Sequence, residues 1–131
     1  MTRREDIRAI PMFEGLDDRS LDLLAGIARK RGFAPGRVIF AEGEPAAGFH
    51  VVAAGRVKVY KIAPDGREQI LHVWGPGEPF GEVAVFEGGA FPAHASALEA
   101  TETFLFPRAD LLDVARKQPE PALKLLALLS W

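Results

Sequence analysis

The segment of residues 75–96 contains the groups best suited to hold a ligand. It reads Gly-Pro-Gly-Glu-Pro-Phe-Gly-Glu-Val-Ala-Val-Phe-Glu-Gly-Gly-Ala-Phe-Pro-Ala-His-Ala-Ser. Gly81 precedes a possible helical turn that begins at Glu82, and the first N–H groups of a helix have no partner within it. Such groups can receive a phosphate or a carboxylate without any side-chain cation. A tight connection from a strand to a helix is the alternative interpretation of the same glycines.

This segment lacks a fixed positive charge, because no lysine or arginine occurs between Glu68 and Pro107. Within residues 75–96, His94 is the one side chain that can become cationic. A histidine side chain ordinarily has a pKa of about 6.5 and is mostly neutral at pH 7. His94 is therefore a weak substitute for an arginine, and a structural or solvated imidazole is the alternative interpretation.

The composition is that of one ordinary globular domain. The chain has 131 residues, of which 48% are hydrophobic and 26% are charged. The absence of cysteine excludes disulfides, zinc–thiolate sites and cysteine-ligated iron–sulfur clusters. The first residues are charged, unlike a secretory signal, and no apolar run approaches the roughly 20 residues of a membrane span. We therefore expect a cytoplasmic protein with no membrane partner.

The distribution of charge argues against direct DNA binding by this chain. Residues 1–67 contain 12 Lys+Arg against 9 Asp+Glu, whereas residues 68–131 contain 4 against 9. Neither part has the dense basic stripe that binding to a phosphate backbone requires. We interpret the cluster Arg29-Lys30-Arg31 as a solvated face.

Catalysis is not indicated by the sequence. No serine lies in a nucleophile elbow, and His94, Ser96 and Glu99 do not form a recognisable triad pattern. We therefore predict no catalytic residue, no enzyme activity and no metal site.

Helices are predicted at both ends of the chain. Apolar residues recur near helical spacing over residues 16–27, with Asp17 as a favoured N-cap. Residues 108–116 predict a further helix, and residues 120–131 predict another after Pro119. The last helix is apolar on nearly every side, so it must pack against the rest of the domain or against a second copy of the chain.

Between these helices the sequence changes to short apolar runs separated by glycine and proline. Pro64-Asp65-Gly66 is typical of a hairpin loop between two of these runs. Short strands at this spacing predict a mainly β barrel or sandwich, and we favour a double-stranded β-helix jelly roll. The predicted division is N-terminal helices in residues 1–30, the jelly roll in 31–107 and C-terminal helices in 108–131. The expected strands are residues 37–41, 48–54, 56–62, 67–74, 94–100 and 101–106.

Several motifs occur in an order that is similar to one protein family. They are residues 37–45, 48–60, 65–70 and 75–82, followed by a leucine-rich helix. With these motifs the chain resembles the effector domain of the Crp/Fnr transcription regulators, from about Ile7 to its end. The resemblance implies a cyclic-nucleotide-binding jelly roll and a homodimer formed through a helix that begins near Pro121. It also implies that the chain is truncated and that DNA is contacted only by a winged-helix domain beyond residue 131.

The family's ligand residues are only partly retained. Gly81 matches the glycine of the phosphate-binding cassette, and Glu82 matches the acid that accepts a ribose hydroxyl. The arginine that pairs with the cyclic phosphate falls on Pro92, and the hydroxyl residue after it falls on Ala93. Loss of a bidentate arginine should weaken cyclic-AMP binding by about two or more powers of ten.

The resemblance therefore implies a sensor whose small-molecule effector is not a tightly bound cyclic nucleotide. A ligand-free dimerisation or structural module, filled by its own Phe and Leu side chains, is an alternative of another class. The predicted effector-binding residues are Phe80, Gly81, Glu82, Val83, Ala84, Pro92, Ala93 and His94.

Haem is the alternative cofactor. Some family members that respond to nitric oxide or carbon monoxide hold haem, and residues 48–66 look similar to the denitrification-regulator branch. The possible axial ligands are His50, His72, His94 and Met12. No haem motif is present, and a structural, hydrogen-bonded imidazole is the alternative for the two histidines in apolar strand runs.

Overall fold

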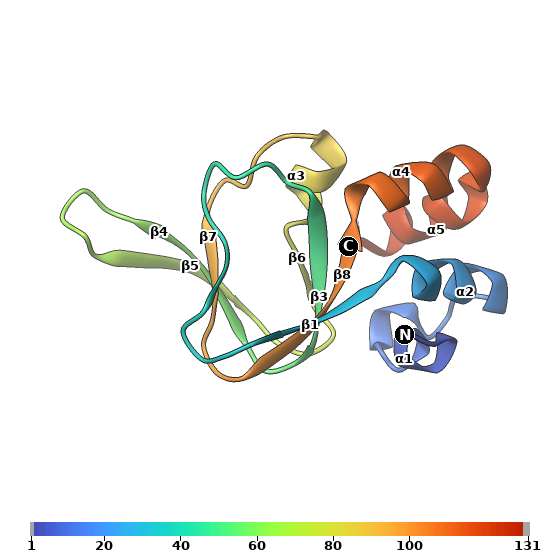
Figure 1. The fold of residues 1–131 in the computed structure, drawn as a ribbon, viewed down its shortest axis with the longest axis horizontal. Coiled ribbons are helices and arrows are strands. Elements are labelled where there is room, and N and C mark those ends of the chain that lie inside the picture. The colour runs from blue at the N-terminus through green and yellow to red at the C-terminus, as the bar shows by residue number, and fades with distance from the viewer. Residues whose placement is uncertain (1, 130–131) are drawn as a thin grey trace.

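The computed structural model describes residues 2–129 and consists of a β barrel with helices packed against one side (Figure 1). The chain begins with α1 (Arg4–Arg8), the 3-10 turn η1 (Pro11–Phe13) and α2 (Asp18–Ile27). It ends with α4 (Arg108–Lys117) and α5 (Pro119–Leu129), beside the N-terminal helices. Asp17 is the N-cap residue of α2, as the sequence predicts. Within the described residues, no helix has the length and apolar character needed to span a membrane.

Two antiparallel sheets of four strands form the barrel, which confirms the mainly β jelly-roll fold. The strand order is β1-β8-β3-β6 in one sheet and β2-β7-β4-β5 in the other. A short helix, α3 (Glu82–Glu87), lies between β6 and β7. The strands are β1 (Arg29–Phe33), β2 (Val38–Phe40), β3 (Gly48–Ala54), β4 (Val57–Ile62), β5 (Glu68–Trp74), β6 (Pro79–Phe80), β7 (His94–Ala97) and β8 (Thr101–Pro107).

Strand β1 is the main element that the sequence pattern did not predict. Its side chains are largely exposed, as expected for a charged face, but its backbone pairs with β8. The Nζ atom of Lys30 lies 3.5 Å from a carboxylate oxygen of Glu102 on the neighbouring strand. An edge strand with charged side chains has no apolar alternation to reveal it, although it resists unwanted pairing with other chains.

The hairpin predicted around residues 64–66 is present between β4 and β5. The N–H of Gly66 donates to the carbonyl of Ala63 at 2.8 Å, and Gly66 has φ of +88°. The hairpin projects from the barrel on the side away from the helices (Figure 1).

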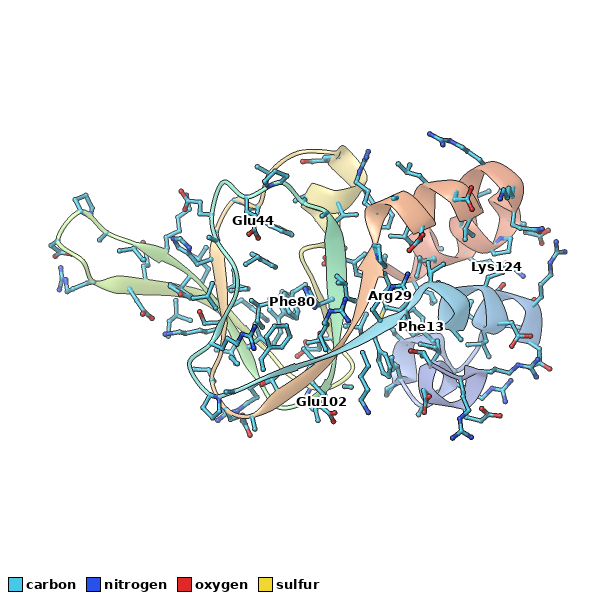
Figure 2. The ribbon with its side chains drawn as sticks, in the orientation of Figure 1. Phe13, Arg29, Glu44, Phe80, Glu102 and Lys124 are labelled. Carbon is cyan, nitrogen blue, oxygen red and sulfur yellow. The ribbon has the colours of Figure 1, made fainter. Side chains whose placement is uncertain are left out.

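Aromatic side chains connect the helices to the barrel. Phe106 of β8 is fully buried, and its ring centroid lies 5.1 Å from Phe49 and 6.0 Å from Phe13. Figure 2 shows Phe13 at the boundary with the helices and Phe80 inside the barrel. In α5, Leu125 is 3% exposed whereas Leu123 is 65% exposed, so the last helix buries one face against α2 and α4.

We predict that Gly55→Ala destabilises the fold far more than Gly66→Ala. Both glycines have φ near +90°, which costs an alanine about 1–2 kcal/mol. At Gly55 an added Cβ would also lie 2.5 Å from the carbonyl oxygen of Ala100, whereas it meets nothing within 4 Å at Gly66. Urea denaturation should show a loss of unfolding free energy of about 3 kcal/mol or more for the first variant and about 1 kcal/mol for the second. Equal losses would contradict this description of the β3–β4 turn.

Candidate functional site

A cavity of about 240 Å³ lies between α3, the segment that leads into β7, and strands β2, β4 and β5. We call it the cassette cavity. Seven of the eight predicted effector-binding residues line it, and His94 does not. The lining consists of Phe40, Val59, Trp74, Phe80, Gly81, Glu82, Val83, Ala84, Glu87, Ala90, Phe91, Pro92 and Ala93.

Gly81 directs the chain from β6 into α3 at the edge of this cavity. It is the N-cap residue of α3 and has a left-handed φ of +83°. A Cβ at this position would lie 3.1 Å from Phe91 and 3.4 Å from Phe40. Glycine is therefore required for both backbone conformation and space. The first N–H groups of α3 remain available to a ligand, because they have no partner within the helix.

Stacked aromatic rings form the inner wall. Phe40 and Phe91 stack with centroids 3.7 Å apart and planes 6° apart. Phe80 lies 5.9 Å from Phe40 and stacks on His50 at 5.1 Å. The three phenylalanines are buried, so the barrel interior behind the cavity is closed by apolar rings.

The opposite wall is held in place by backbone hydrogen bonds. The N–H of Phe91 donates to the carbonyl of Glu44 at 3.0 Å, and the N–H of Gly43 donates to the carbonyl of Phe91 at 2.8 Å. The N–H of Ala46 donates to the carbonyl of Gly89 at 3.0 Å. These bonds fix the positions of Pro92 and Ala93, the two residues that replace an arginine and a hydroxyl in the pattern that the family resemblance implies.

Glu82 has an unsatisfied buried oxygen. Its Oε2 atom is shielded from solvent and has no hydrogen-bond partner among the described residues. A buried acceptor without a donor is costly, so an O–H or N–H group of a ligand at this atom would be favourable. The arrangement suits the hydroxyl-binding role that the sequence predicts for Glu82.

The charged groups of the lining are both acids. Within the described part of the chain, Glu82 and Glu87 line the cassette cavity and no lysine, arginine or histidine does. Pro92 is exposed and Ala93 is buried, and neither carries a charge or a hydroxyl. An anion in this cavity would meet two carboxylates, and the donors of the described lining are uncharged N–H groups, those of the backbone and the indole of Trp74.

The structure places His94 away from the cassette cavity. In β7, Ala95 pairs with Val59, which lines the cavity, whereas His94 pairs with Tyr60. Successive side chains of a strand point to opposite faces, so His94 points away from the side of Val59. Its Nδ1 atom accepts a hydrogen bond from the N–H of Glu42 at 3.1 Å, and its ring lies 5.3 Å from that of Tyr60.

The four candidate haem ligands lie in different environments. His50 is buried in the barrel, with Nδ1 hydrogen-bonded to the hydroxyl of Thr103 at 2.8 Å. His72 is exposed beside Trp74, and Met12 is half-buried in η1. None of the four candidate haem ligands, His94 included, lines the cassette cavity.

Sequence reasoning missed the residues of the cavity that come from the sheet. Phe40, Val59 and Trp74 lie in β2, β4 and β5, outside the cassette segment. The alternation of residues along β4 could have indicated Val59 as a residue that faces inward. Phe40 carries no such signal, because its strand is only three residues long and pairs irregularly with β7.

Comparison with known proteins identifies the class of this domain. Residues 30–118 match the cyclic nucleotide-binding domain family, so the chain belongs to that family. The resemblance to the effector domain of Crp/Fnr regulators is also confirmed. The chain is 34% identical to the cyclic AMP receptor protein of Thermus thermophilus, covering 95% of this chain and 57% of the relative.

Two further relatives support the assignment. A CRP-like cAMP-activated global transcriptional regulator of Mycobacterium tuberculosis is 30% identical, covering 91% of this chain and 53% of the relative. The structure of the N-terminal domain of a Streptomyces coelicolor transcriptional regulator has a TM-score of 0.81 and 34% identity, covering 95% of this chain and 89% of that one. The chain thus spans about half the length of the curated relatives that it matches.

A solved sensor domain is also similar. The sensor domain of the transcriptional regulator DNR from Pseudomonas aeruginosa has a TM-score of 0.78 and 30% identity, covering 97% of this chain and 85% of that one. The similarity to these proteins extends through the helices at both ends as well as the barrel.

We predict that His50 makes stability depend on pH. Burial lowers the pKa of its imidazole to about 4, and the charge of Arg31 acts in the same direction. Between about pH 6.5 and 4 the unfolded chain binds more protons at this residue than the folded chain, so the unfolding free energy falls as pH falls. At about 1.4 kcal/mol per pKa unit the loss is about 3 kcal/mol.

The measurement is urea denaturation at several pH values for the unmodified chain and for His50→Gln. Because carboxylates titrate in both proteins, the difference between their profiles isolates His50. Parallel profiles would show that the imidazole is not held neutral by its surroundings.

Proposed function

We propose that this domain is the cytoplasmic, ligand-sensing half of a bacterial Crp/Fnr-type transcription regulator whose effector is not a tightly bound cyclic nucleotide. The supporting observation is the cassette cavity, which Gly81 and Glu82 line and in which, among the described residues, acids are the only charged side chains of the lining. The turn at Gly81 that would receive a ligand is therefore kept, while the described lining supplies no cation to select a cyclic phosphate.

Electrostatics favour this proposal. Each charge-assisted hydrogen bond of an arginine contributes about 1.5–3 kcal/mol, so a bidentate pair is worth two or more powers of ten in affinity. Pro92 supplies neither bond, and the Glu87 carboxylate adds repulsion to a phosphodiester. The similar proteins named for cyclic AMP therefore indicate the class of this domain and not its effector.

The same cavity favours a different effector chemistry. The stacked rings of Phe40 and Phe91 offer an apolar, aromatic surface, and the unsatisfied oxygen of Glu82 needs a donor. We propose an uncharged or cationic small molecule that has an apolar ring or chain and at least one O–H or N–H group. Such a ligand would pack on the rings and donate a hydrogen bond to Glu82, without requiring a cation from the protein.

Signalling would pass from the cassette to the end of the chain. Arg108, the first residue of α4, donates from Nε to the carbonyl of Val85 in α3 at 2.8 Å. Because α4 packs on α5, movement of α3 would change the position of α5. We propose that α5 is the start of the dimerisation helix and that two DNA-binding domains, beyond this chain, respond to its position.

Calorimetry on the purified chain tests the proposal directly. Titrations with cyclic AMP and cyclic GMP should show weak or no heat, whereas titrations with uncharged and cationic aromatic alcohols and amines should show binding. Tight, stoichiometric cyclic-AMP binding would overturn the proposed effector class. Haem binding is tested separately by the absorbance spectrum after haem is added. A Soret band that disappears in His50→Ala, His72→Ala or His94→Ala would instead support a haem sensor. No response in any titration would support a ligand-free module.

We predict that Pro92→Arg raises the affinity for cyclic AMP by about tenfold or more, because it adds a guanidinium to the lining of the cavity that Gly81 also lines. Ala90→Arg is the matched control, since Ala90 lines the same cavity and the substitution adds the same charge. Calorimetry should show a clear gain for the first variant and a much smaller gain for the second. Equal gains would mean a general effect of charge, and no gain in Pro92→Arg would mean that this residue does not occupy the phosphate-binding position.

A further inference from the structure

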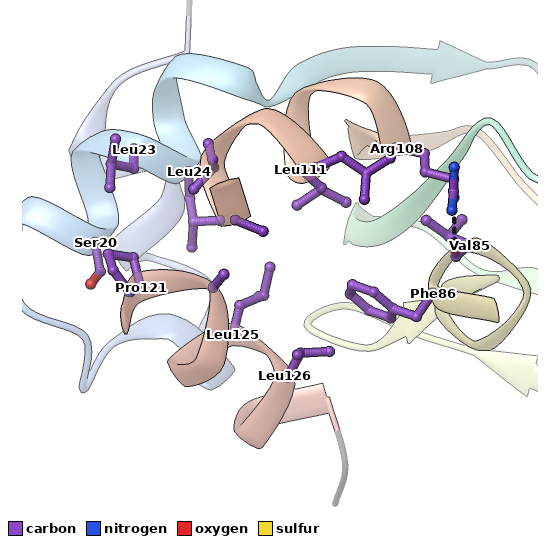
Figure 3. A pocket seen from close by; sticks show the side chains of 14 residues that line it. Ser20, Leu23, Leu24, Val85, Phe86, Arg108, Leu111, Pro121, Leu125 and Leu126 are labelled. Atoms are coloured by element: carbon purple, nitrogen blue, oxygen red, sulfur yellow. Dashed lines mark hydrogen bonds between the residues drawn. The ribbon is translucent and has the colours of Figure 1, made fainter. Parts of the chain in front are cut away.

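A second cavity lies where α3 meets the helices at the two ends of the chain (Figure 3). Its volume is about 230 Å³, and we call it the joint cavity. Leu24 of α2, Leu111 of α4 and Leu125 of α5 line one part of it, and Val85 and Phe86 of α3 line another. Figure 3 shows the side chains of these helices around one common space. The cavity shares no lining residue with the cassette cavity.

Only two polar side chains line this cavity within the described residues, Ser20 and Arg108. The hydroxyl of Ser20 donates to the carboxylate of Asp17 at 2.7 Å. The same carboxylate oxygen accepts a bond from the Nζ atom of Lys124 at 3.0 Å. Ser20 is thus already engaged in a network at the α2–α5 end, which leaves Arg108 as the polar group that could bind a ligand.

Arg108 is placed to receive an anion. Its guanidinium lies over the end of α3, where the Nη2 atom would be 2.9 Å from a Cβ added at Gly88. Nε bonds to the carbonyl of Val85, and no carboxylate among residues 2–129 forms an ion pair with Arg108. By contrast, Arg56 pairs with Glu99 at 2.6 Å. The other N–H groups of Arg108 can therefore donate to an acidic ligand.

We propose that the joint cavity binds a small amphipathic anion, such as a medium-chain alkanoate, whose carboxylate meets Arg108 while its alkyl chain lies among Leu24, Leu111 and Leu125. The charge of Arg108 selects the head group, and the aliphatic walls select the tail. Each CH₂ group that becomes buried should raise the affinity by about fourfold.

A ligand in this position would touch α3 and α5 at the same time. It would hold the cassette and the proposed dimerisation helix in one relative position, without entering the cassette cavity. The joint cavity is therefore a site for a second regulator that is chemically distinct from the cassette ligand.

Calorimetry with octanoate, 1-octanol and octyltrimethylammonium, each below its aggregation concentration, tests the head-group preference on the purified chain. Octanoate should bind with a stoichiometry of one and more tightly than the other two. Arg108→Gln should lower the affinity for octanoate by about ten- to a hundredfold and leave the affinity for octanol unchanged. Arg116 is an exposed residue of the same helix, so Arg116→Gln is the matched control and should change neither affinity.

A second variant tests whether the alkyl chain of octanoate lies in the joint cavity. Ala115 lines the joint cavity from α4, so Ala115→Leu should fill the space and abolish octanoate binding while circular dichroism shows an intact fold. The proposal is overturned if the unmodified chain does not bind octanoate or if octanol binds as tightly. It is also overturned if either variant, with an intact fold by circular dichroism, binds octanoate as tightly as the unmodified chain.

Discussion

The packing of Gly81 against the rings of Phe40 and Phe91 is the contact on which the rest of the site depends. Those rings stack at 3.7 Å, and a Cβ at Gly81 would come within 3.1 Å of one of them. The left-handed turn at Gly81 then sets where α3 begins. Since residues of α3 line both cavities, this single turn positions the walls of two different sites. A side chain at residue 81 would move both of them.

The fold and the ligand chemistry are separable because they use different parts of the same segment. Backbone bonds between residues 43–46 and 89–91 hold the wall in place, and these bonds do not depend on the side chains of Pro92 or Ala93. A cassette can therefore keep its shape while its wall loses a cation. This explains how a clear member of a cyclic nucleotide-binding family can contain a cavity that has no cationic side chain in its described lining and an unsatisfied carboxylate oxygen.

Much of this arrangement could be predicted from local sequence, and the failures have physical causes. Strand β3, the loop at Gly66, the N-cap at Asp17 and helix α3 all follow from alternation, turn residues and capping. Strand β1 could not be found in this way, because its exposed charged residues carry no periodic pattern. The inner wall of the cassette cavity was missed for another reason: Phe40 reaches it through tertiary packing, which sequence spacing does not encode. His94 follows Ala93 directly but does not line the cavity, because in a strand a step of one residue reverses the direction of the side chain.

Helix α3 contributes residues to the walls of both cavities. Val83 and Ala84 line the cassette cavity, whereas the next two residues, Val85 and Phe86, line the joint cavity. A helix of six residues is too short to move one face independently of the other, and Phe86 also lies 5.9 Å from Phe49 of β3. If both cavities bind ligands as proposed, a ligand that favours one position of α3 would change the affinity of the other cavity, and the effect would be equal in both directions. In the proposed signalling route, the hydrogen bond from Arg108 to the carbonyl of Val85 would carry the same displacement into α4, so the coupling between the sites and the signal to α5 would share one structural route.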